Sequence, residues 1–314
     1  MAQYLIRRFA LSIISLIAIS MVIFSILALA PGDPLGELAV NPNIPASVRE
    51  NMRKKYGLDD PIHVRYWRWA SGYVRGDWDE SLTTKSSVRD YVFSRVPVTL
   101  AVVGSAFLLG ILIAIPVGVI SAIKQNSLFD QFATTFAFIG FSIPTFFSGL
   151  LLIVLFSVKF QWLPFVFDNQ VTGFWPNLKQ AIMPIVVLGL AGSAQLTRFV
   201  RASMLETINQ DYVRTARAKG LREQTVVILH AMRNALIPVV TIIALQVPEI
   251  LGGAVITEQI FRVPGIGSAL ISGINGRDVP VVMAITFGVA ILVVLFNVIA
   301  DVLYAVLDPR IKYS

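Results

Sequence analysis

Long apolar runs separated by shorter polar stretches dominate this chain of 314 residues. A membrane core of about 30 Å needs about 20 apolar residues in a helix, and six stretches reach that length. They cover approximately 9–29, 99–123, 132–158, 181–200, 236–257 and 280–306. The pattern therefore predicts an all-α integral membrane protein with six transmembrane helices.

The distribution of Lys and Arg between the runs predicts the orientation. If both ends of the chain are cytoplasmic, the short cytoplasmic pieces hold twelve of the 26 basic residues and the two short outer loops hold four. The remaining ten lie in residues 31–96, a segment long enough to cross the membrane whatever its charge. Short cytoplasmic loops are enriched in basic residues, so we expect both termini to be cytoplasmic.

The first apolar run has an alternative interpretation as a cleaved secretory signal. Arg7 and Arg8 precede it, and Ala28-Leu29-Ala30 resembles a cleavage site. Signal cores have about 7 to 15 apolar residues, whereas this run has 21. We therefore expect residues 1–30 to form a retained N-terminal transmembrane helix.

Residues 31–96 predict a small extracytoplasmic cap before a five-helix core at 97–314. Pro31-Gly-Asp-Pro34 should end the first helix, and a short helix is expected over 45–57. A second helix over 61–73 carries the aromatic residues Tyr66, Trp67 and Trp69. Such residues fit either the headgroup region of the membrane or a packed lid.

Composition removes several classes of function. Hydrophobic residues make up 55% of the chain and charged residues 14%, which no soluble core would accommodate. There are no cysteines and only two histidines, so we expect no metal site. No GxxxxGK[ST] motif is present, so the chain itself should not bind ATP. The net charge of +7 is largely explained by membrane topology, so lipid is the expected partner and nucleic acid is not.

The fifth run contains the candidates for a substrate pathway, Gln246, Pro248 and Glu249. Glu249 lies about 20 Å along the helix from Leu236, too deep for its side chain to reach either membrane surface. A carboxylate inside a membrane normally faces a cavity or a partner. Glu249 therefore either contacts substrate or is hydrogen-bonded between helices.

A basic segment at 201–235, between the fourth and fifth runs, has the pattern of two helices. The apolar residues at helical spacing in its first half are Leu205, Ile208, Tyr212 and Ala216. With Gly220 as a stop, we expect a helix over 203–220 and a second one carrying Val226, Val227 and Leu229. A solvated cytoplasmic loop would explain the charges alone, but the two-helix pattern indicates a surface presented to a partner.

Seven motifs, which follow one another along essentially the whole chain, carry a family resemblance. They are Ala30-Pro-Gly-Asp-Pro34, Tyr56-Gly-Leu-Asp-Asp-Pro61, Arg95-Val-Pro-Val-Thr-Leu100, Asp211-Tyr-Val-Arg-Thr-Ala-Arg-Ala-Lys-Gly-Leu221, Glu258-Gln-Ile-Phe-Arg-Val-Pro-Gly-Ile-Gly267, Arg277-Asp-Val-Pro-Val-Val282 and Leu307-Asp-Pro-Arg-Ile311. The chain resembles the transmembrane permease of bacterial dipeptide, oligopeptide and nickel ABC importers, specifically the subunit with a long periplasmic segment after its first span.

The resemblance implies a type I ABC importer permease fold in the bacterial inner membrane, and no enzymatic activity of its own. The residues that it assigns to coupling with an ATPase are Tyr212, Arg214, Thr215, Ala216, Arg217, Lys219, Gly220 and Leu221. The generic motif opens with a glutamate, whose place Arg214 takes here. Pro248 and Glu249 are also unusual for the family and are therefore candidates for cargo selection.

The resemblance further implies four kinds of partner. A second homologous permease would complete the pathway, one or two ATP-binding subunits would hold ATP and Mg, an extracytoplasmic solute-binding protein would deliver cargo, and lipid would surround the assembly. The residues expected to dock the binding protein are Phe261, Pro264, Gly265, Arg277 and Asp278. The cargo would be a peptide or a similar small solute. The alternative is a secondary, ion-coupled transporter that uses Glu249.

Overall fold

The computed structural model describes residues 2–29, 59–168 and 170–307, together with positions 45, 47, 50, 51, 53, 54 and 57. The predicted helix break at Pro31–Pro34 and the tail at 308–314 lie outside the described residues. Within the described ranges every element of regular structure is helical, apart from one isolated bridge between Glu80 and Ser87. The predicted all-α class is confirmed.

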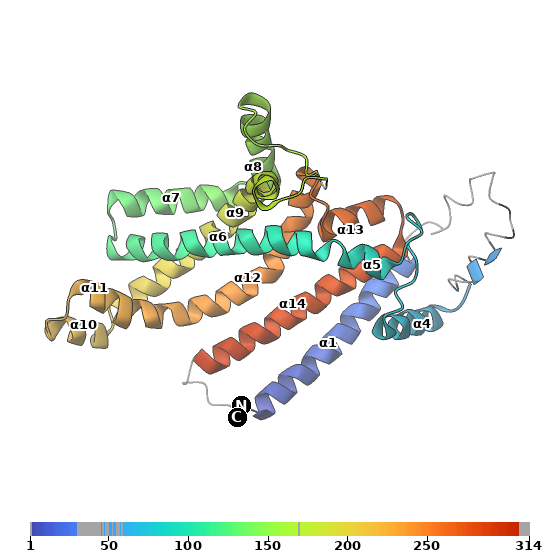
Figure 1. Ribbon diagram of the computed structural model, residues 1–314. Coiled ribbons are helices and arrows are strands. Elements are labelled where there is room, and N and C mark those ends of the chain that lie inside the picture. Colours follow the sequence, from blue (N-terminus) through green and yellow to red (C-terminus); the bar gives the residue numbers. More distant parts are fainter. Residues whose placement is uncertain are drawn as a thin grey trace.

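Five long helices are apolar enough to cross a membrane among the residues described. They are α1 (Ala2–Leu29), α6 (Val96–Ile123), α9 (Phe174–Ile208), α12 (Arg233–Ile260) and α14 (Val279–Leu307). Figure 1 shows them as the long members of one bundle. Each overlaps one of the predicted apolar runs, so these five spans are confirmed.

The third predicted span is broken, and the prediction of a single helix over 132–158 is wrong. The segment forms α7 (Leu128–Ser142), α8 (Thr145–Leu152) and a π-helical turn, η1 (Ile153–Lys159), with a bend of 101° after α7. Pro144 lacks an N–H group and disfavours the helical conformation in the residue before it, and Ile143 is extended at φ −86°, ψ 122°. Counted as one broken span, this pair brings the total of candidate spans to six.

The bundle has two distinct ends. One end carries α10 (Asp211–Ala218) and α11 (Glu223–Thr225), and the opposite end carries α4 (Ile62–Arg75), α5 (Val88–Phe93) and α13 (Ile266–Asn275) (Figure 1). We call these the α10 end and the α13 end. Arg8 near the start of α1 forms an ion pair with Asp301 near the end of α14. The two outermost helices are therefore tied together towards the α10 end, where α1 begins and α14 finishes (Figure 1).

Close packing of α6 on α9 forms the centre of the bundle. A Cβ added at Gly110 would lie 3.2 Å from the carbonyl oxygen of Gly189, and one at Gly118 would lie 2.7 Å from Cβ of Val200. Small residues permit such approach between helices in lipid, where apolar burial gives little driving force. The bundle therefore has a rigid pair of helices at its centre.

The cap helix α4 matches the predicted helix at 61–73 and is terminated after Arg75 by Gly76, which has φ +83°. The Tyr66 hydroxyl lies 2.9 Å from the Ser20 hydroxyl of α1, and the ring of Trp69 contacts Phe287 of α14 at 5.4 Å between centroids. The side chain of Trp67 is 73% exposed. Two of the three aromatic residues therefore pack the cap onto the bundle, as the lid alternative required, and the third faces outward.

Candidate functional site

At the α10 end, α9 and α10 are separate helices joined by a break of two residues. The long helix α9 ends at Ile208, Gln210 is extended at φ −71°, ψ 150°, and α10 begins at Asp211. The side-chain amide of Asn209 donates to the carbonyl of Leu205 at 2.9 Å and so takes up one of the carbonyls at the helix end. The prediction of an uninterrupted helix over 203–220 is therefore wrong.

This break resets which residues of α10 face inward. Val213 is fully buried and Ala216 is 5% exposed, whereas Tyr212 is 43% exposed. The two buried residues pack in a cluster with Val226, Val227 and Ala231 of η2 (Val226–Met232), and with residues of α6, α9 and α12. The helical spacing of Tyr212 and Ala216 with Leu205 and Ile208 is therefore interrupted. Because the periodicity restarts at Asp211, Ala216 lies inward and Tyr212 does not.

The rest of the predicted coupling residues lie on the exposed surface of α10 and its following turn. The exposed members are Tyr212, Arg214, Thr215, Arg217, Lys219, Gly220 and Leu221. Gly220 has φ +78°, a conformation that side-chain-bearing residues rarely adopt, and a Cβ there would have no atom within 4 Å. The glycine is thus required by the backbone turn and leaves an open surface above it.

An ion pair closes this turn. The guanidinium of Arg217 donates from Nη2 to Oε1 of Glu223 at 2.8 Å and from Nε to Oε2 at 3.1 Å. The hydrogen bonds from the guanidinium to Glu223 raise the pKa of Arg217 above its ordinary value, so the pair remains charged. A bidentate pair fixes direction as well as distance. The connection between α10 and α11 is therefore a braced loop whose basic face remains exposed.

A second ionic cluster joins α7 to α9 and was missed from the sequence. Asp130 is 3% exposed and accepts from Arg201 at 2.6 Å to Nε and 2.8 Å to Nη2. It also accepts from the Ser121 hydroxyl at the end of α6 and from the backbone N–H of Asn126 at 2.9 Å. In the sequence Arg201 counted only as a loop charge, and Asp130 stood just outside a predicted span. The cluster holds three helices together two turns before α9 ends.

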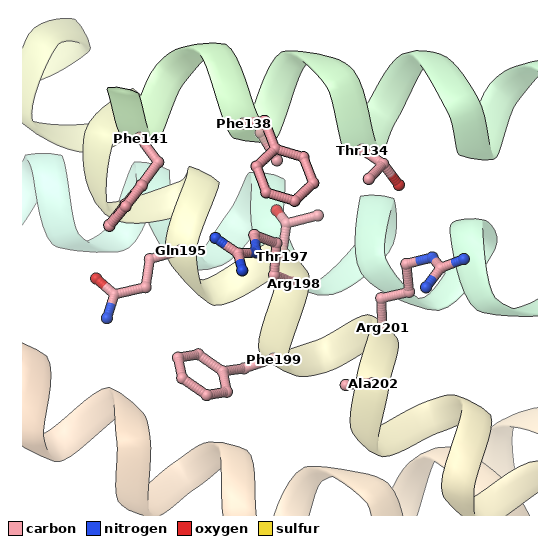
Figure 2. Close-up of a pocket in the computed structure, with 10 residues that line it drawn as sticks. Thr134, Phe138, Phe141, Gln195, Thr197, Arg198, Phe199, Arg201 and Ala202 are labelled. Atoms are coloured by element: carbon pink, nitrogen blue, oxygen red, sulfur yellow. The ribbon is translucent and has the colours of Figure 1, made fainter. Parts of the chain in front are cut away.

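Two adjoining cavities lie where α7, α8, α9 and α12 meet. One has a volume of about 420 Å³ and lies between α7 and α9; Figure 2 shows Phe138 and Phe141 of α7 opposite Gln195 and Arg198 of α9. The other, about 270 Å³, shares Phe141 and Gln195 with the first and extends to Gln246 of α12. The helix break at Ile143–Pro144 also lines this second cavity.

The predicted pathway residues have different positions relative to these cavities. Gln246 is 5% exposed and lines the smaller cavity. Pro248 is half-buried inside α12, which continues through it. The backbone of Glu249 belongs to α12, but its side chain lies outside what the structure describes. Gln246 is thus the predicted pathway residue that the structure places at a cavity.

At the α13 end, Glu258 anchors the start of α13. Its carboxylate is 1% exposed and accepts from the Thr99 hydroxyl at 2.6 Å and from the N–H groups of Gly267 at 2.7 Å and Ser268 at 3.1 Å. Negative charge at a helix N-terminus is stabilising, because the first N–H groups have no helical acceptor. A Cβ at Gly265 would lie 2.1 Å from Oε1 of Glu258, so the chain can pass this carboxylate only without a side chain.

The residues predicted to dock a binding protein differ in how far their side chains are exposed. Phe261 and Asp278 are each 2% exposed, and Asp278 accepts from the Ser81 hydroxyl and from the N–H groups of Leu82 and Thr83. Pro264 is half-buried, Gly265 is buried and Arg277 is exposed. Phe261 and Asp278 therefore lie beneath the surface of the α13 end and pack against the residues that form it, whereas Pro264 and Arg277 reach that surface.

No cluster of three or more His, Asp or Glu side chains suited to a metal occurs in the described part of the chain. The polar groups instead form pairs and helix caps. The pairs and caps fix the helices relative to one another. Together with the exposed basic loop and the two cavities, they are the features expected of a transport subunit.

Comparison with known proteins agrees with this geometry. The family described as binding-protein-dependent transport system inner membrane component matches residues 114–313, and the N-terminal region of such membrane components matches residues 1–103. The chain is similar over its whole length to the whole oligopeptide transport system permease protein AppB of Bacillus subtilis, at 43% identity, and to the whole glutathione transport system permease protein GsiC of Escherichia coli, at 37%.

The alternative of an ion-coupled secondary transporter gains no support from these matches. The family consists of membrane permeases, not enzymes, and its members reside in the inner membrane. The chain belongs to the family of binding-protein-dependent transport system inner membrane components, and it is a permease subunit of an ABC importer.

Proposed function

We propose that this permease forms half of a translocation pathway for peptides or similar small solutes. Support comes from its full-length similarity to one permease named for oligopeptides and another named for glutathione, itself a small peptide. The two adjoining cavities between α7, α9 and α12 are lined by aromatic and carboxamide side chains, and the larger one also by Arg198 and Arg201. Such a lining accommodates varied side chains better than a pocket built for one charged solute.

The exposed surface of α10 with Gly220 and Leu221 is the proposed contact for an ATP-binding subunit. The single observation that carries this proposal is that α10 is exposed on one side and fixed on the other. Val213 and Ala216 pack into the same apolar cluster as α6, α9 and α12. A push on Tyr212, Arg214 or Lys219 is therefore transmitted to three spans rather than absorbed by a flexible loop.

Permeases of ABC importers work with a second permease, ATP-binding subunits and a solute-binding protein. We assign ATP and Mg to one or two separate ATP-binding subunits, which agrees with the absence of a phosphate-binding motif from the sequence of this chain. This assignment places the α10 end and both termini in the cytoplasm, in accordance with the excess of basic residues in the loops on that side.

The α13 end is the proposed docking site for the solute-binding protein. Pro264 and Arg277 lie at its surface, while Phe261, Gly265 and Asp278 are buried beneath it. The cap at 31–96 adds to this surface after the N-terminal helix at 1–30, and the core at 97–314 carries the pathway. Gln246, Pro248 and Glu249 are its proposed lining residues on α12.

Uptake by the complete assembly tests this function. The permease is reconstituted in vesicles with its second permease and ATP-binding subunits, and the binding protein is added outside with a labelled dipeptide. We expect accumulation only when ATP is present inside, and competition by other short peptides. Accumulation driven by an ion gradient without ATP would contradict the mechanism, and competition only by non-peptide solutes would contradict the cargo.

A further inference from the structure

The smaller of the two cavities contains an unpaired buried amide. Gln246 is 5% exposed, and its Nε2 has no hydrogen-bond partner in the described part of the chain. Leaving a buried donor unpaired destabilises a protein, so in native structures such a group normally has a bound water, ion or ligand as its partner. The group therefore requires an explanation outside the folded chain itself.

A second carboxamide lines the same cavity from another helix. Gln195 of α9 is half-buried, and Figure 2 shows its amide group at the end of the side chain, projecting away from the α9 backbone. No hydrogen bond to this amide is formed among the described residues. Two carboxamides without partners, on helices α9 and α12, therefore line a cavity of about 270 Å³.

The depth of the cavity along α12 agrees with a binding position near the middle of the membrane. Gln246 lies about 20 Å from either end of α12 at 1.5 Å per residue. The wall between α7 and α8 contains Pro144, which cannot donate the helical hydrogen bond to the Gly140 carbonyl. Irregular backbone is tolerated at this depth only where protein or an internal cavity surrounds it.

We propose that Gln246 and Gln195 bind one peptide unit of the cargo during passage, independently of its side chains. This inference rests on the proposed function. Nε2 of Gln246 donates to a carbonyl oxygen of the cargo, and Oε1 of Gln195 accepts from the cargo N–H. The terminal torsion of Gln is soft, so Nε2 turns towards the cavity when an acceptor enters. A carboxamide offers a donor and an acceptor, which is what a peptide group requires.

The chemistry also explains how one site serves cargo of different sequence. Peptides share their backbone amides and differ in their side chains. Phe141 lies between the two cavities, and the larger one continues beside Phe138, whose ring is stacked under Arg198 at 4.6 Å. Side chains of the cargo therefore have apolar and aromatic surface to contact while the two carboxamides hold the backbone.

The test uses the full assembly in vesicles and a matched pair of cargoes, a dipeptide and its ester analogue with –O– in place of –NH–. The quantity measured is the ratio of their uptake rates. The binding protein is the same for every variant, so its own preference cancels when ratios are compared. The ester lacks the N–H from which Gln195 accepts but keeps the carbonyl to which Gln246 donates. We therefore expect Gln195→Met to lower the peptide-to-ester ratio by roughly 5- to 10-fold, the range for loss of one hydrogen bond. Gln246→Met should lower the uptake of both cargoes by a similar factor and leave their ratio unchanged.

Thr241→Val is the matched control. The Thr241 hydroxyl of α12 is also buried without a partner among the described residues, but Thr241 is not among the residues that line the cavity. We expect its uptake of both cargoes, and hence their ratio, to equal those of the wild type. Should Gln246→Met fail to assemble, Gln195→Met still tests the proposal through the ratio, from the opposite wall.

Three results would overturn the proposal. An unchanged ratio in assembled Gln195→Met, or unchanged uptake of both cargoes in assembled Gln246→Met, with peptide uptake intact in the wild type, rejects the peptide-binding role alone. An equal fall of both uptake rates in Thr241→Val indicates general loosening of α12 and rejects the role of Gln246 as well. If the wild-type assembly takes up no peptide, the proposed function fails and this inference fails with it.

Discussion

Arg217 and Glu223 hold the two sides of the exposed turn at the α10 end through a bidentate ion pair, with Nη2 and Oε1 separated by 2.8 Å. The side chains are 40% and 57% exposed, so the pair adds little to overall stability. Its effect is geometric, because it fixes the direction in which α10 approaches α11. A transmitting element needs this stiffness more than it needs stability.

Breaking this pair should impair coupling but not folding. In Glu223→Gln we expect the free energy of unfolding to change by less than about 1 kcal/mol, as for other exposed ion pairs. Substrate-stimulated ATP hydrolysis of the assembly should fall severalfold, while insertion in the membrane stays normal. The exchanged double variant Arg217→Glu with Glu223→Arg should recover part of the loss. Failure of the exchange to restore any stimulation would show that Arg217 acts directly on a partner.

Gly220→Pro tests the turn itself. Proline fixes φ near −65°, whereas Gly220 has φ +78°, so the turn must rearrange. We expect normal insertion with a loss of most substrate stimulation of ATP hydrolysis. Gly220→Ala meets no neighbouring atom and suffers only the cost of positive φ, about 1 kcal/mol, so its stimulation should be intermediate. Full stimulation in the proline variant would refute a coupling role for this turn.

Removing one partner of the ion pair between Asp130 and Arg201 should destabilise the bundle. In Asp130→Asn the mostly buried guanidinium loses its counter-charge, for which we expect a cost of about 3 kcal/mol. The double variant Asp130→Asn with Arg201→Met removes both charges and should be less damaging. Thermal unfolding of the purified assembly in detergent measures both. Equal stability of Asp130→Asn and wild type would mean that α7 and α9 are held by apolar packing alone.

The start of α13 should respond to substitution of Gly265. In Gly265→Ala the new methyl group would lie 2.1 Å from Oε1 of Glu258, so the carboxylate and the N–H groups of Gly267 and Ser268 must separate. We expect faster hydrogen exchange in residues 266–275 and slower uptake from the binding protein. Gly252→Ala, which meets no atom within 4 Å, is the control and should leave both unchanged.

Periodicity and span length were sufficient to predict five spans, because each is a long apolar run whose ends are marked by charged or polar residues. They were insufficient for the third, since the dipeptide Ile143-Pro144 within an apolar run is compatible with a kink, a break or a straight continuation. The bend of 101° combines the extended Ile143 before Pro144 with contacts of α7 and α8 on α9 and of α8 on α12, which leave no pattern in the sequence.

The candidate site likewise combines features that the sequence predicts with features that depend on tertiary structure. The position of Gly220 as a helix stop followed from residue type, but the burial of Val213 in place of Tyr212 depended on a restart at Asp211, where Asn209 competes for the carbonyls at the end of α9. Asp130 and Arg201 are 71 positions apart in the sequence. Their pairing, and the contact of Glu258 with the start of α13, result from tertiary structure and leave no local pattern.

Cross-linking at Lys219 tests the central claim most directly, namely that force enters through α10. The chain has no cysteine, so Lys219→Cys introduces a single thiol on the exposed turn. We predict a disulfide with a single cysteine placed on the facing surface of an ATP-binding subunit, formed at rates that differ with and without ATP. A thiol at Trp175, 75% exposed in the first turn of α9 at the far end of the bundle, should form none. Active assemblies in which Lys219→Cys never reaches that subunit, in any nucleotide state, would contradict this account.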